Sequence, residues 1–201
     1  MNLTLILILG YLVGSIPFAY VIGTLFFHTD VRKHGSGNLG GSNTGRVLGK
    51  KAGVAVMTLD LLKVTFIVYL AQRFCTHPWA VALGALAAAM GHCYPIFANF
   101  RGGKAVATMY GFLFGLWVCC GYSPLTYFLP LVTFLAVLFS TKIVSLSSIT
   151  SSLAVAVYLC CVDSHISVRI AIAVFTGLVI LRHHENIRRM IHGTENKISW
   201  M

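Results

Sequence analysis

The stretch MNLTLILILGYLVGSIPFAYVIGTLFF, residues 1–27, decides the class of fold. It holds no charged residue, and most of its side chains are apolar. A helix that crosses a bilayer needs about 20 largely apolar residues. A signal peptide would instead begin with basic residues and have a shorter apolar core. We therefore interpret residues 3–27 as a first membrane span that stays in the protein.

The composition extends this interpretation to the whole chain. Of 201 residues, 57% are hydrophobic and 10% are charged, with a mean hydropathy of +0.82. A soluble domain would carry about a quarter charged residues. The chain is predicted to be an all-α, polytopic integral membrane protein with residues 1–201 in one domain. About seven transmembrane helices are expected, near residues 3–27, 52–72, 79–98, 104–121, 124–140, 146–162 and 166–181.

The basic residues predict an orientation. Lysine and arginine number 15 against 5 acidic residues, which gives a formal net charge of +10. Twelve of these cations fall in the first, third and fifth loops and the C-terminal tail, two fall in the even loops, and Lys63 lies inside a span. Cytoplasmic loops of membrane proteins are enriched in lysine and arginine. We therefore expect the N-terminus outside and the C-terminus in the cytoplasm, and a nucleic-acid partner is disfavoured.

Cysteines and spans offer little chemistry. No C-x-x-C or zinc spacing occurs, so we expect no metal and no cofactor, and we interpret the cysteines as small buried hydrophobes. Gly10 with Gly14, and Gly111 with Gly115, have the spacing that favours close helix packing. Pro17 and Pro130 fall inside spans, where neighbouring helices can satisfy freed carbonyls. The six cysteines are Cys75, Cys93, Cys119, Cys120, Cys160 and Cys161.

A glycine-rich loop, HGSGNLGGSNTGR (34–46), follows the first span. It contains G-x-G-x-x-G, but a dinucleotide fingerprint requires a preceding strand, and here a membrane helix precedes it. Glycines still permit close backbone approach, so that successive N–H groups can surround an anion. The alternative is a flexible, solvated loop. We favour an anion site formed by Gly35, Ser36, Gly37, Asn38, Gly40, Ser42, Asn43 and Arg46.

Two further polar clusters lie on the same predicted face. Residues 101–104, Arg-Gly-Gly-Lys, directly precede an apolar run, and a helix N-terminus with glycines and a cation favours an anion. The alternative is a positive-inside anchor with a glycine hinge. The segment RHHENIRRMIHGTENK (182–197) follows the last span. His183 and His184 point in different directions on a helix, so at most one is expected to enter a given site, as an acid or base.

Ionisable residues also fall within the second and third spans. Asp60 and Lys63 share a helix face, and charges at membrane depth are either mutually neutralised or functional. Both a structural ion pair and a role in supporting a site remain open. His92 is expected to be a packing or hydrogen-bonding residue. Together the three polar clusters predict a site for a phosphorylated, lipid-related substrate on the cytoplasmic face.

Taken in order, these segments resemble the PlsY family, the acyl-phosphate:glycerol-3-phosphate acyltransferases of bacterial membranes. The resemblance runs nearly end to end, and the ordered set of motifs is highly specific although each alone is modest. The chain departs from the family at Gly41-Ser42, where the family tends to have Ala-Thr, and at Arg101 and Ala105, where it tends to have lysine and glycine. The motifs are GSIPFAY (14–20), GSGNLGGSN (35–43), RVLGKKAG (46–53), Asp60-x-x-Lys63, GHCYPIFANFRGGKAVAT (91–108), VSLSSI (144–149) and RHHENIRRMIHGTENK (182–197).

The resemblance implies transfer of an acyl group from acyl phosphate to the 1-hydroxyl of glycerol 3-phosphate, forming lysophosphatidic acid and phosphate. It implies no metal and no acyl carrier. It also implies a multi-pass protein of the bacterial inner membrane with its active site on the cytoplasmic face. We expect a monomer or weak oligomer whose partners are the two substrates and the bilayer. The acyl chain would lie between helices that open sideways to the bilayer.

The resemblance also implies roles for single residues. Arg46 and Lys104 would hold phosphate, with the backbone of Gly35 to Gly40 and of Gly102 and Gly103. Ser36 and Asn186 would orient substrates, joined by Ser145, and His183 would position the attacking hydroxyl. Because an acyl phosphate is already activated, no covalent enzyme intermediate is required.

Two other functions compete with this one. A transporter for a small anion would also use helix termini and charges within the membrane. It predicts polar residues along a path through the bilayer and an internal repeat, and the sequence shows neither. A membrane phosphotransferase would be expected to show acidic metal ligands, and the chain has only 5 acidic residues.

Overall fold

The computed structural model describes residues 1–162 and 165–198, and in these residues it contains helices and no strand. The all-α prediction is therefore confirmed for the described part of the chain. Its helices are α1 (Leu3–Gly14), α2 (Phe18–Phe27), η1 (Val31–Lys33), α3 (Gly41–Leu48), α4 (Lys50–Phe74), α5 (Ala80–Cys93), η2 (Ile96–Ala98), α6 (Val106–Cys120), α7 (Leu125–Thr141), α8 (Val144–Val162), α9 (Ile166–Arg182) and α10 (His184–Ile191).

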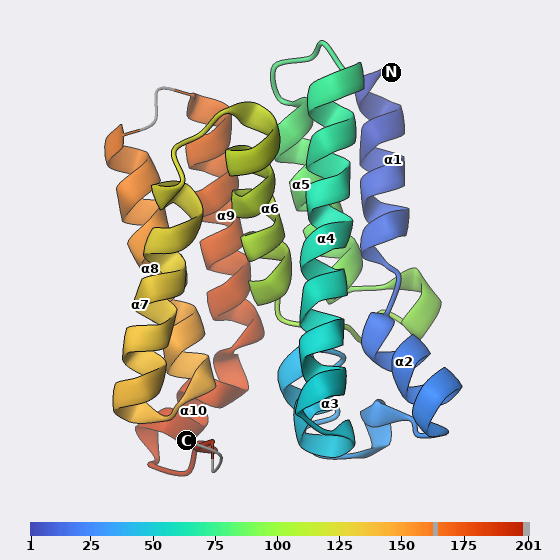
Figure 1. Ribbon diagram of the computed structural model, residues 1–201, viewed down its shortest axis with the longest axis vertical. Coiled ribbons are helices and arrows are strands. Elements are labelled where there is room, and N and C mark those ends of the chain that lie inside the picture. The colour runs from blue at the N-terminus through green and yellow to red at the C-terminus, as the bar shows by residue number, and fades with distance from the viewer. Residues whose placement is uncertain (163–164, 199–201) are drawn as a thin grey trace.

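The longer helices run side by side along the long axis, and the short helices α2, α3 and α10 gather at one end (Figure 1). The last helix, α10, therefore lies at the end opposite to the N-terminus (Figure 1). An odd number of membrane crossings requires this arrangement. Which end faces the cytoplasm stays a prediction.

Within the residues that the structure describes, four segments are long and apolar enough to cross a membrane, and a fifth qualifies if α9 and α10 form one span bent by 58°. The helices α6 and α7 are apolar but shorter, with 15 and 17 residues. The predicted count of seven spans therefore stays a prediction. Each expected span nevertheless coincides with a helix to within a few residues, apart from the first and third. The third, expected at 79–98, ends as a helix at Cys93 and continues into η2.

The first expected span, 3–27, is interrupted. Helix α1 ends at Gly14 and α2 begins at Phe18, with Pro17 at the break. Proline lacks an N–H and cannot continue the ladder of helix hydrogen bonds. The carbonyl of Ile16 instead accepts a hydrogen bond from Nζ of Lys63 at 3.1 Å. A polar group at the break is thus satisfied by a neighbouring helix, as expected for Pro17.

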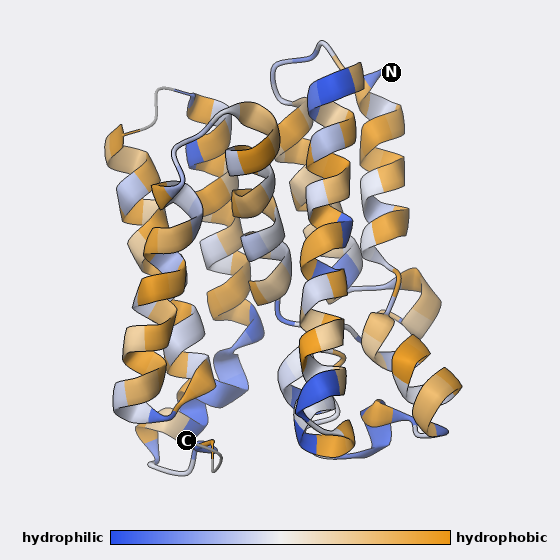
Figure 2. Cartoon of the chain, in the orientation of Figure 1, coloured by the Kyte–Doolittle hydropathy of each residue, from blue (hydrophilic) through white to orange (hydrophobic). Residues whose placement is uncertain are grey.

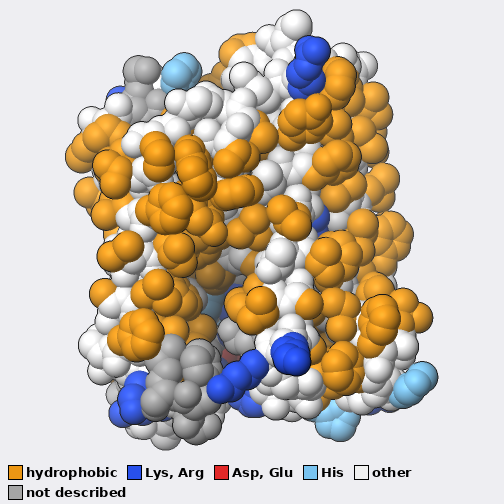
Figure 3. Space-filling model, in the orientation of Figure 1, with side chains coloured by type: hydrophobic (Ala, Val, Ile, Leu, Met, Phe, Trp, Pro, Cys, Tyr) orange, Lys and Arg blue, Asp and Glu red, His pale blue; other side chains and the backbone are white. Residues whose placement is uncertain are grey.

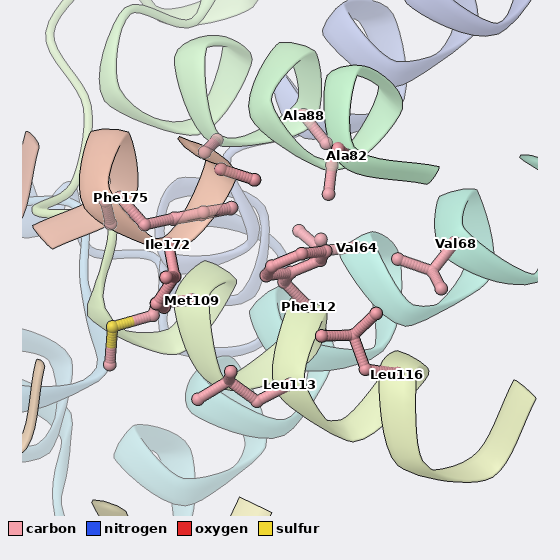
Figure 4. Close-up of a cluster of buried hydrophobic side chains, with 14 of the residues drawn as sticks. Val64, Val68, Ala82, Ala88, Met109, Phe112, Leu113, Leu116, Ile172 and Phe175 are labelled. Carbon is pink, nitrogen blue, oxygen red and sulfur yellow. The ribbon is translucent and has the colours of Figure 1, made fainter. Parts of the chain in front are cut away.

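The core lies where α4, α5, α6 and α9 meet (Figure 4). Phe112 of α6 stacks on Phe175 of α9, with ring centroids 5.3 Å apart. Val64 and Val68 of α4 lie in the same cluster. Because lipid is as apolar as these side chains, close packing rather than escape from water holds such helices together.

Glycines set the closest helix contacts. A methyl group at Gly14 would collide with the backbone of Ala88 on α5, and one at Gly10 would meet the carbonyl of Gly84. On the other interface, Gly111 faces the Leu61 carbonyl in the same way. The predicted packing role of these glycines is confirmed.

Polar residues concentrate at the ends of the bundle, and apolar residues cover its length (Figure 2). Cys93 is buried, as expected, but the prediction of buried cysteines is wrong for Cys160 and Cys161, which are exposed on α8. A thiol is apolar enough for a helix surface in contact with lipid. Asp60 and Lys63 form the predicted ion pair inside the bundle, with Nζ and Oδ1 2.6 Å apart.

Candidate active site

A cleft of about 690 Å³ opens at the end where α2, α3 and α10 gather. Lysine and arginine side chains also gather at this end (Figure 3). The three polar clusters of the sequence converge here, as expected. The cleft is lined by Gly35, Ser36, Gly37, Asn38, Arg46, Phe100, Arg101, Gly102, Lys104, Arg182, His184, Glu185, Asn186, Arg189 and Asn196.

The glycine-rich loop has a defined shape. Gly35 and Gly37 have φ of 60° and 69°, in the left-handed region that glycine adopts without strain. The buried side chain of Asn43 holds the loop from behind. Its Oδ1 accepts a hydrogen bond from the Ser36 N–H at 2.8 Å, and its Nδ2 donates to the carbonyls of Val31 and His34. The alternative of a loose, solvated loop is therefore disfavoured.

Arg46 reaches the cleft from α3, and glycines fix that helix. A methyl group at Gly41 would meet the Gly53 carbonyl and Met57, both on α4. Gly53 in turn packs against the backbone of Gly41 and Gly45. The two helices thus touch backbone to backbone, which places Arg46 at the cleft with an exposed side chain.

The second polar cluster, residues 101–104, is hydrogen-bonded to both of the other clusters that line the cleft. Nε of Arg182 donates to the Gly103 carbonyl at 3.0 Å, and its Nη2 donates to the Gly102 carbonyl at 3.2 Å. Asn38 Nδ2 also donates to Gly102, at 3.3 Å. These bonds cover carbonyl oxygens that would otherwise repel an anion. The segment ends at Ala105, whose φ of 61° costs a residue with a Cβ about 1–2 kcal/mol.

A side-chain network joins this segment to the C-terminal tail. Nζ of Lys104 donates to Oδ1 of the buried Asn186, and Nδ2 of Asn186 donates to Oε1 of Glu195. Glu195 also accepts from Ser145 Oγ at 2.8 Å and from Arg189 Nε at 2.7 Å. Burial raises the pKa of Glu195, but these hydrogen bonds and the charge of Arg189 outweigh it and hold the pKa below its ordinary value. A buried carboxylate therefore fixes the donors around it.

Two further groups have shifted pKa values. Burial lowers the pKa of Lys104 to about 8, and the charge of Glu195 only partly offsets this. Burial also lowers the pKa of His183 to about 4, so the ring is neutral at pH 7. Its Nδ1–H donates to the Val179 carbonyl at 2.7 Å, which leaves Nε2 as an acceptor.

The expected site residues divide by position. Eight line the cleft: Gly35, Ser36, Gly37, Asn38, Arg46, Gly102, Lys104 and Asn186. Asn43, Gly103, Ser145 and His183 are buried beside the cleft and are not among its lining residues. Gly40, the residue before α3, and the exposed Ser42 are also not among them.

Some expected backbone donors are already engaged. The N–H of Gly103 donates to the His92 carbonyl at 3.0 Å, and that of Gly37 donates to the His34 carbonyl at 3.0 Å. With Ser36, three amides of the two loops bond within the protein. Side-chain cations and the remaining amides are left to meet a ligand.

Sequence reasoning did not single out Glu195, Arg182 or His184 as site residues. Glu195 is one of only 5 acidic residues and lies in a strongly basic tail, which was an available signal. His184, not His183, lines the cleft, because α9 ends at Arg182 and α10 leaves at an angle of 58°.

The fold and cleft define a multi-pass, all-helical membrane protein with a cationic cleft at one end of its bundle. The family model for glycerol-3-phosphate acyltransferases matches residues 4–193, and the chain belongs to this family. Its members are acyltransferases of phospholipid biosynthesis, which confirms the family resemblance.

Relatives match over nearly the whole chain. Glycerol-3-phosphate acyltransferase of Geobacillus kaustophilus is 43% identical over 98% of this chain and 96% of its own. That of Bacillus cytotoxicus is 47% identical over 98% and 95%. The crystal structure of PlsY, an integral membrane glycerol 3-phosphate acyltransferase, in its glycerol 3-phosphate form has a TM-score of 0.90 at 36% identity and covers 98% and 96%. Its lysophosphatidic acid form has a TM-score of 0.87 at 34% identity, covering 98% and 95%.

Proposed function

We propose that this protein transfers an acyl group from acyl phosphate to the 1-hydroxyl of sn-glycerol 3-phosphate, forming lysophosphatidic acid and inorganic phosphate. One observation carries the proposal: the cleft is lined by five cationic side chains contributed by three separate segments. These are Arg46, Arg101, Lys104, Arg182 and Arg189. Such a surplus suits two substrates that each carry a phosphate group. The relatives' names and the two ligand forms of PlsY support the same substrate and product.

The reaction is a direct transfer. The 1-hydroxyl oxygen attacks the acyl carbon, a new ester C–O bond forms, and the C–O bond to the phosphate breaks. Arg46 and Lys104 bind phosphate oxygens and stabilise the charge that develops on the leaving group. Ser36 and Asn186 orient the substrates. No covalent intermediate is needed, because acyl phosphate is already activated.

The proton of the hydroxyl leaves to the departing phosphate. A good general base has a pKa near the working pH. The pKa of His183 is lowered to about 4 by burial, and that of Glu195 also lies below its ordinary value, so both are weak bases. His183 then acts by positioning the attacking hydroxyl through its acceptor Nε2, and it does not take the proton.

The remaining features of the proposal concern location. The cleft lies on the cytoplasmic face of the bacterial inner membrane, where glycerol 3-phosphate arrives from solution and acyl phosphate from the bilayer. The protein acts as a monomer or weak oligomer, without a metal, a cofactor or a nucleic-acid partner. The expected acyl-chain path runs between the helices and opens to lipid.

The deciding experiment supplies the purified protein, in lipid nanodiscs, with palmitoyl phosphate and glycerol 3-phosphate. Lysophosphatidic acid and inorganic phosphate should form in equal amounts. Palmitoyl-CoA in place of palmitoyl phosphate tests the donor and should give no product. Uptake of glycerol 3-phosphate into vesicles without any product would instead favour a transporter and would refute the acyltransferase proposal.

The role of His183 has its own test. A His183→Ala variant should lose turnover, and His192→Ala, at an exposed position that does not line the cleft, is the matched control. A His183→Ala variant with full turnover would remove His183 from the mechanism without affecting the proposed reaction.

A further inference from the structure

Three ionisable side chains lie inside the bundle, beneath the cleft. Asp60, Lys63 and His92 have exposed fractions of 1%, 5% and 6%. Besides its pair with Asp60, Nζ of Lys63 lies 3.2 Å from Nδ1 of His92, and the same Nδ1 lies 3.4 Å from Oδ1 of Asp60. The imidazole is therefore held on one edge by an ion pair. We refer to these three residues as the buried triad.

The other edge of the imidazole touches the cleft loop. A methyl group at Gly103 would collide with three ring atoms of His92, Nε2 among them. The Gly103 N–H also donates to the His92 carbonyl at 3.0 Å. The ring and backbone of one residue thus form the support on which Gly103 rests.

The position of Gly103 decides the position of Lys104. Because the two residues are consecutive, a shift of Gly103 moves the Cα of Lys104 with it. Nζ of Lys104 is bound to Asn186, and Arg182 donates hydrogen bonds to the carbonyls of Gly102 and Gly103. The loop is therefore fixed by Arg182 through its carbonyls and by the contact of Gly103 with the His92 ring.

We propose that His92, held in place by Asp60 and Lys63, is a positioning residue. Its contact with Gly103 fixes the position of that backbone and so places the Lys104 ammonium in the cleft. None of the three residues touches the cleft, and each acts through the loop. Burying an ion pair is expensive and adds little stability by itself. The Asp60–Lys63 pair gains a function because it holds the His92 ring, whose contact with Gly103 sets the position of the loop. This inference rests on the proposed function, because it assigns Lys104 to phosphate binding.

A size exchange between positions 92 and 103 tests the contact. Gly103 has no positive φ, so its backbone accepts alanine, and the three atoms nearest to the added methyl group all belong to the His92 ring. Gly103→Ala should push the loop away and lower kcat/KM for glycerol 3-phosphate by about 100-fold, the size expected for a misplacement of about 1 Å. His92→Ala should also lower it, by loosening the loop.

The double variant decides the question. In His92→Ala/Gly103→Ala the new methyl group fills the space that the ring leaves. We expect kcat/KM to recover by about tenfold or more relative to Gly103→Ala, as coupled neighbours do. Losses that simply multiply would overturn the proposal. Gly177→Ala on α9 is the matched control, because no atom lies within 4 Å of its added methyl group.

A second arm tests the ion pair. The Asp60→Asn/Lys63→Met variant removes both charges together, so no charge is left unpaired in the bundle. It should raise KM for glycerol 3-phosphate in the wild-type background and add no further loss to His92→Ala. A full, independent loss on top of His92→Ala would contradict action through the ring. Thermal unfolding of every variant separates a misplaced loop from a damaged fold.

Binding and turnover distinguish this inference from the proposed function. Calorimetric titration measures the affinity for glycerol 3-phosphate, which depends on the position of the loop and does not require acyl transfer. Binding that follows the size exchange while palmitoyl phosphate gives no product would refute the reaction and keep the positioning role. Turnover of the wild type, with fold losses in kcat/KM that multiply in the double variant, would support the reaction and refute the positioning role. A wild type that neither binds nor reacts would overturn both.

Discussion

The two walls of the cleft are held by different means. One wall, residues 35–46, is shaped by backbone conformation: left-handed glycines and the single buried amide of Asn43. The other wall consists of side chains that bind one another around Glu195: Ser145, Asn186 and Arg189, with Lys104 bound to Asn186. We call them the glycine wall and the network wall.

The difference concerns charge. On the network wall a carboxylate partly neutralises the cations and fixes their geometry before any ligand arrives. On the glycine wall, within the residues that the structure describes, no carboxylate pairs with Arg46. A preorganised donor stabilises developing charge without reorganising. An exposed arginine, by contrast, is free to follow an arriving phosphate.

Removing the Lys104 cation from the network wall should have the largest effect on activity. Lys104→Ala should lower kcat/KM for glycerol 3-phosphate by about 100-fold, because a charged donor to phosphate is lost. Lys33→Ala removes the same charge from an exposed position away from the cleft and should leave kinetics unchanged. If Lys104→Ala and Arg46→Ala both keep wild-type kinetics, neither wall clamps phosphate.

On the glycine wall, the residue to test is Asn43, because its side chain holds the loop conformation. Asn43→Ala leaves the Ser36 N–H without an acceptor and removes one of two donors from each of the Val31 and His34 carbonyls. A buried polar group left unsatisfied costs about 1–3 kcal/mol. We expect a lower unfolding temperature and a loss in kcat/KM of about 10–100-fold, since Ser36 is displaced. Steady-state kinetics and thermal unfolding measure the two effects. A variant that unfolds earlier but turns over normally would show that the loop conformation is not needed for catalysis.

The pH dependence should report the network wall alone. The pKa of Lys104 is lowered to about 8, so its ammonium is present below that pH and is lost as the pH rises through it. KM for glycerol 3-phosphate should therefore rise above about pH 8. Lys104→Arg should remove this inflection, because a guanidinium stays protonated. An inflection that persists in Lys104→Arg would belong to another group.

Ser42 gives the smallest expected effect. Its side chain is exposed and does not line the cleft, although the sequence placed it among the anion-binding residues. Ser42→Ala should change kcat/KM by no more than about twofold, as surface substitutions do. It is also the matched control for Asn43→Ala on the same helix. A large loss would mean that Ser42 meets a substrate directly.

Much of this arrangement follows from residue patterns. Apolar runs predict the long helices, and glycine spacing predicts the contacts of Gly14 and Gly111. The basic loops predict that three polar segments share one end. Lys104 and Asn186 lie 82 positions apart in sequence, yet both were expected at that end and they are in contact.

Other features depend on geometry that no local pattern encodes. The break at residue 183 turns one of two adjacent histidines into the cleft, and the direction of that turn comes from packing. The tail folds back after Gly193, whose φ is 69°, and only then does Glu195 reach Asn186. The interruption at Pro17 was expected to stay within one span, but the sequence did not indicate that Lys63 would bond to the Ile16 carbonyl.

The contact between α3 and α4 has a consequence for mutation. Every missense change of a glycine codon by one nucleotide introduces a larger side chain. At Gly53 even a methyl group meets the backbone of Gly41 and Gly45 on the facing helix. The surface against which the helix of Arg46 packs therefore has no conservative variant within one mutational step at this codon. Random mutagenesis under selection for growth should leave Gly53 unchanged while the exposed Ser42 codon accepts substitutions.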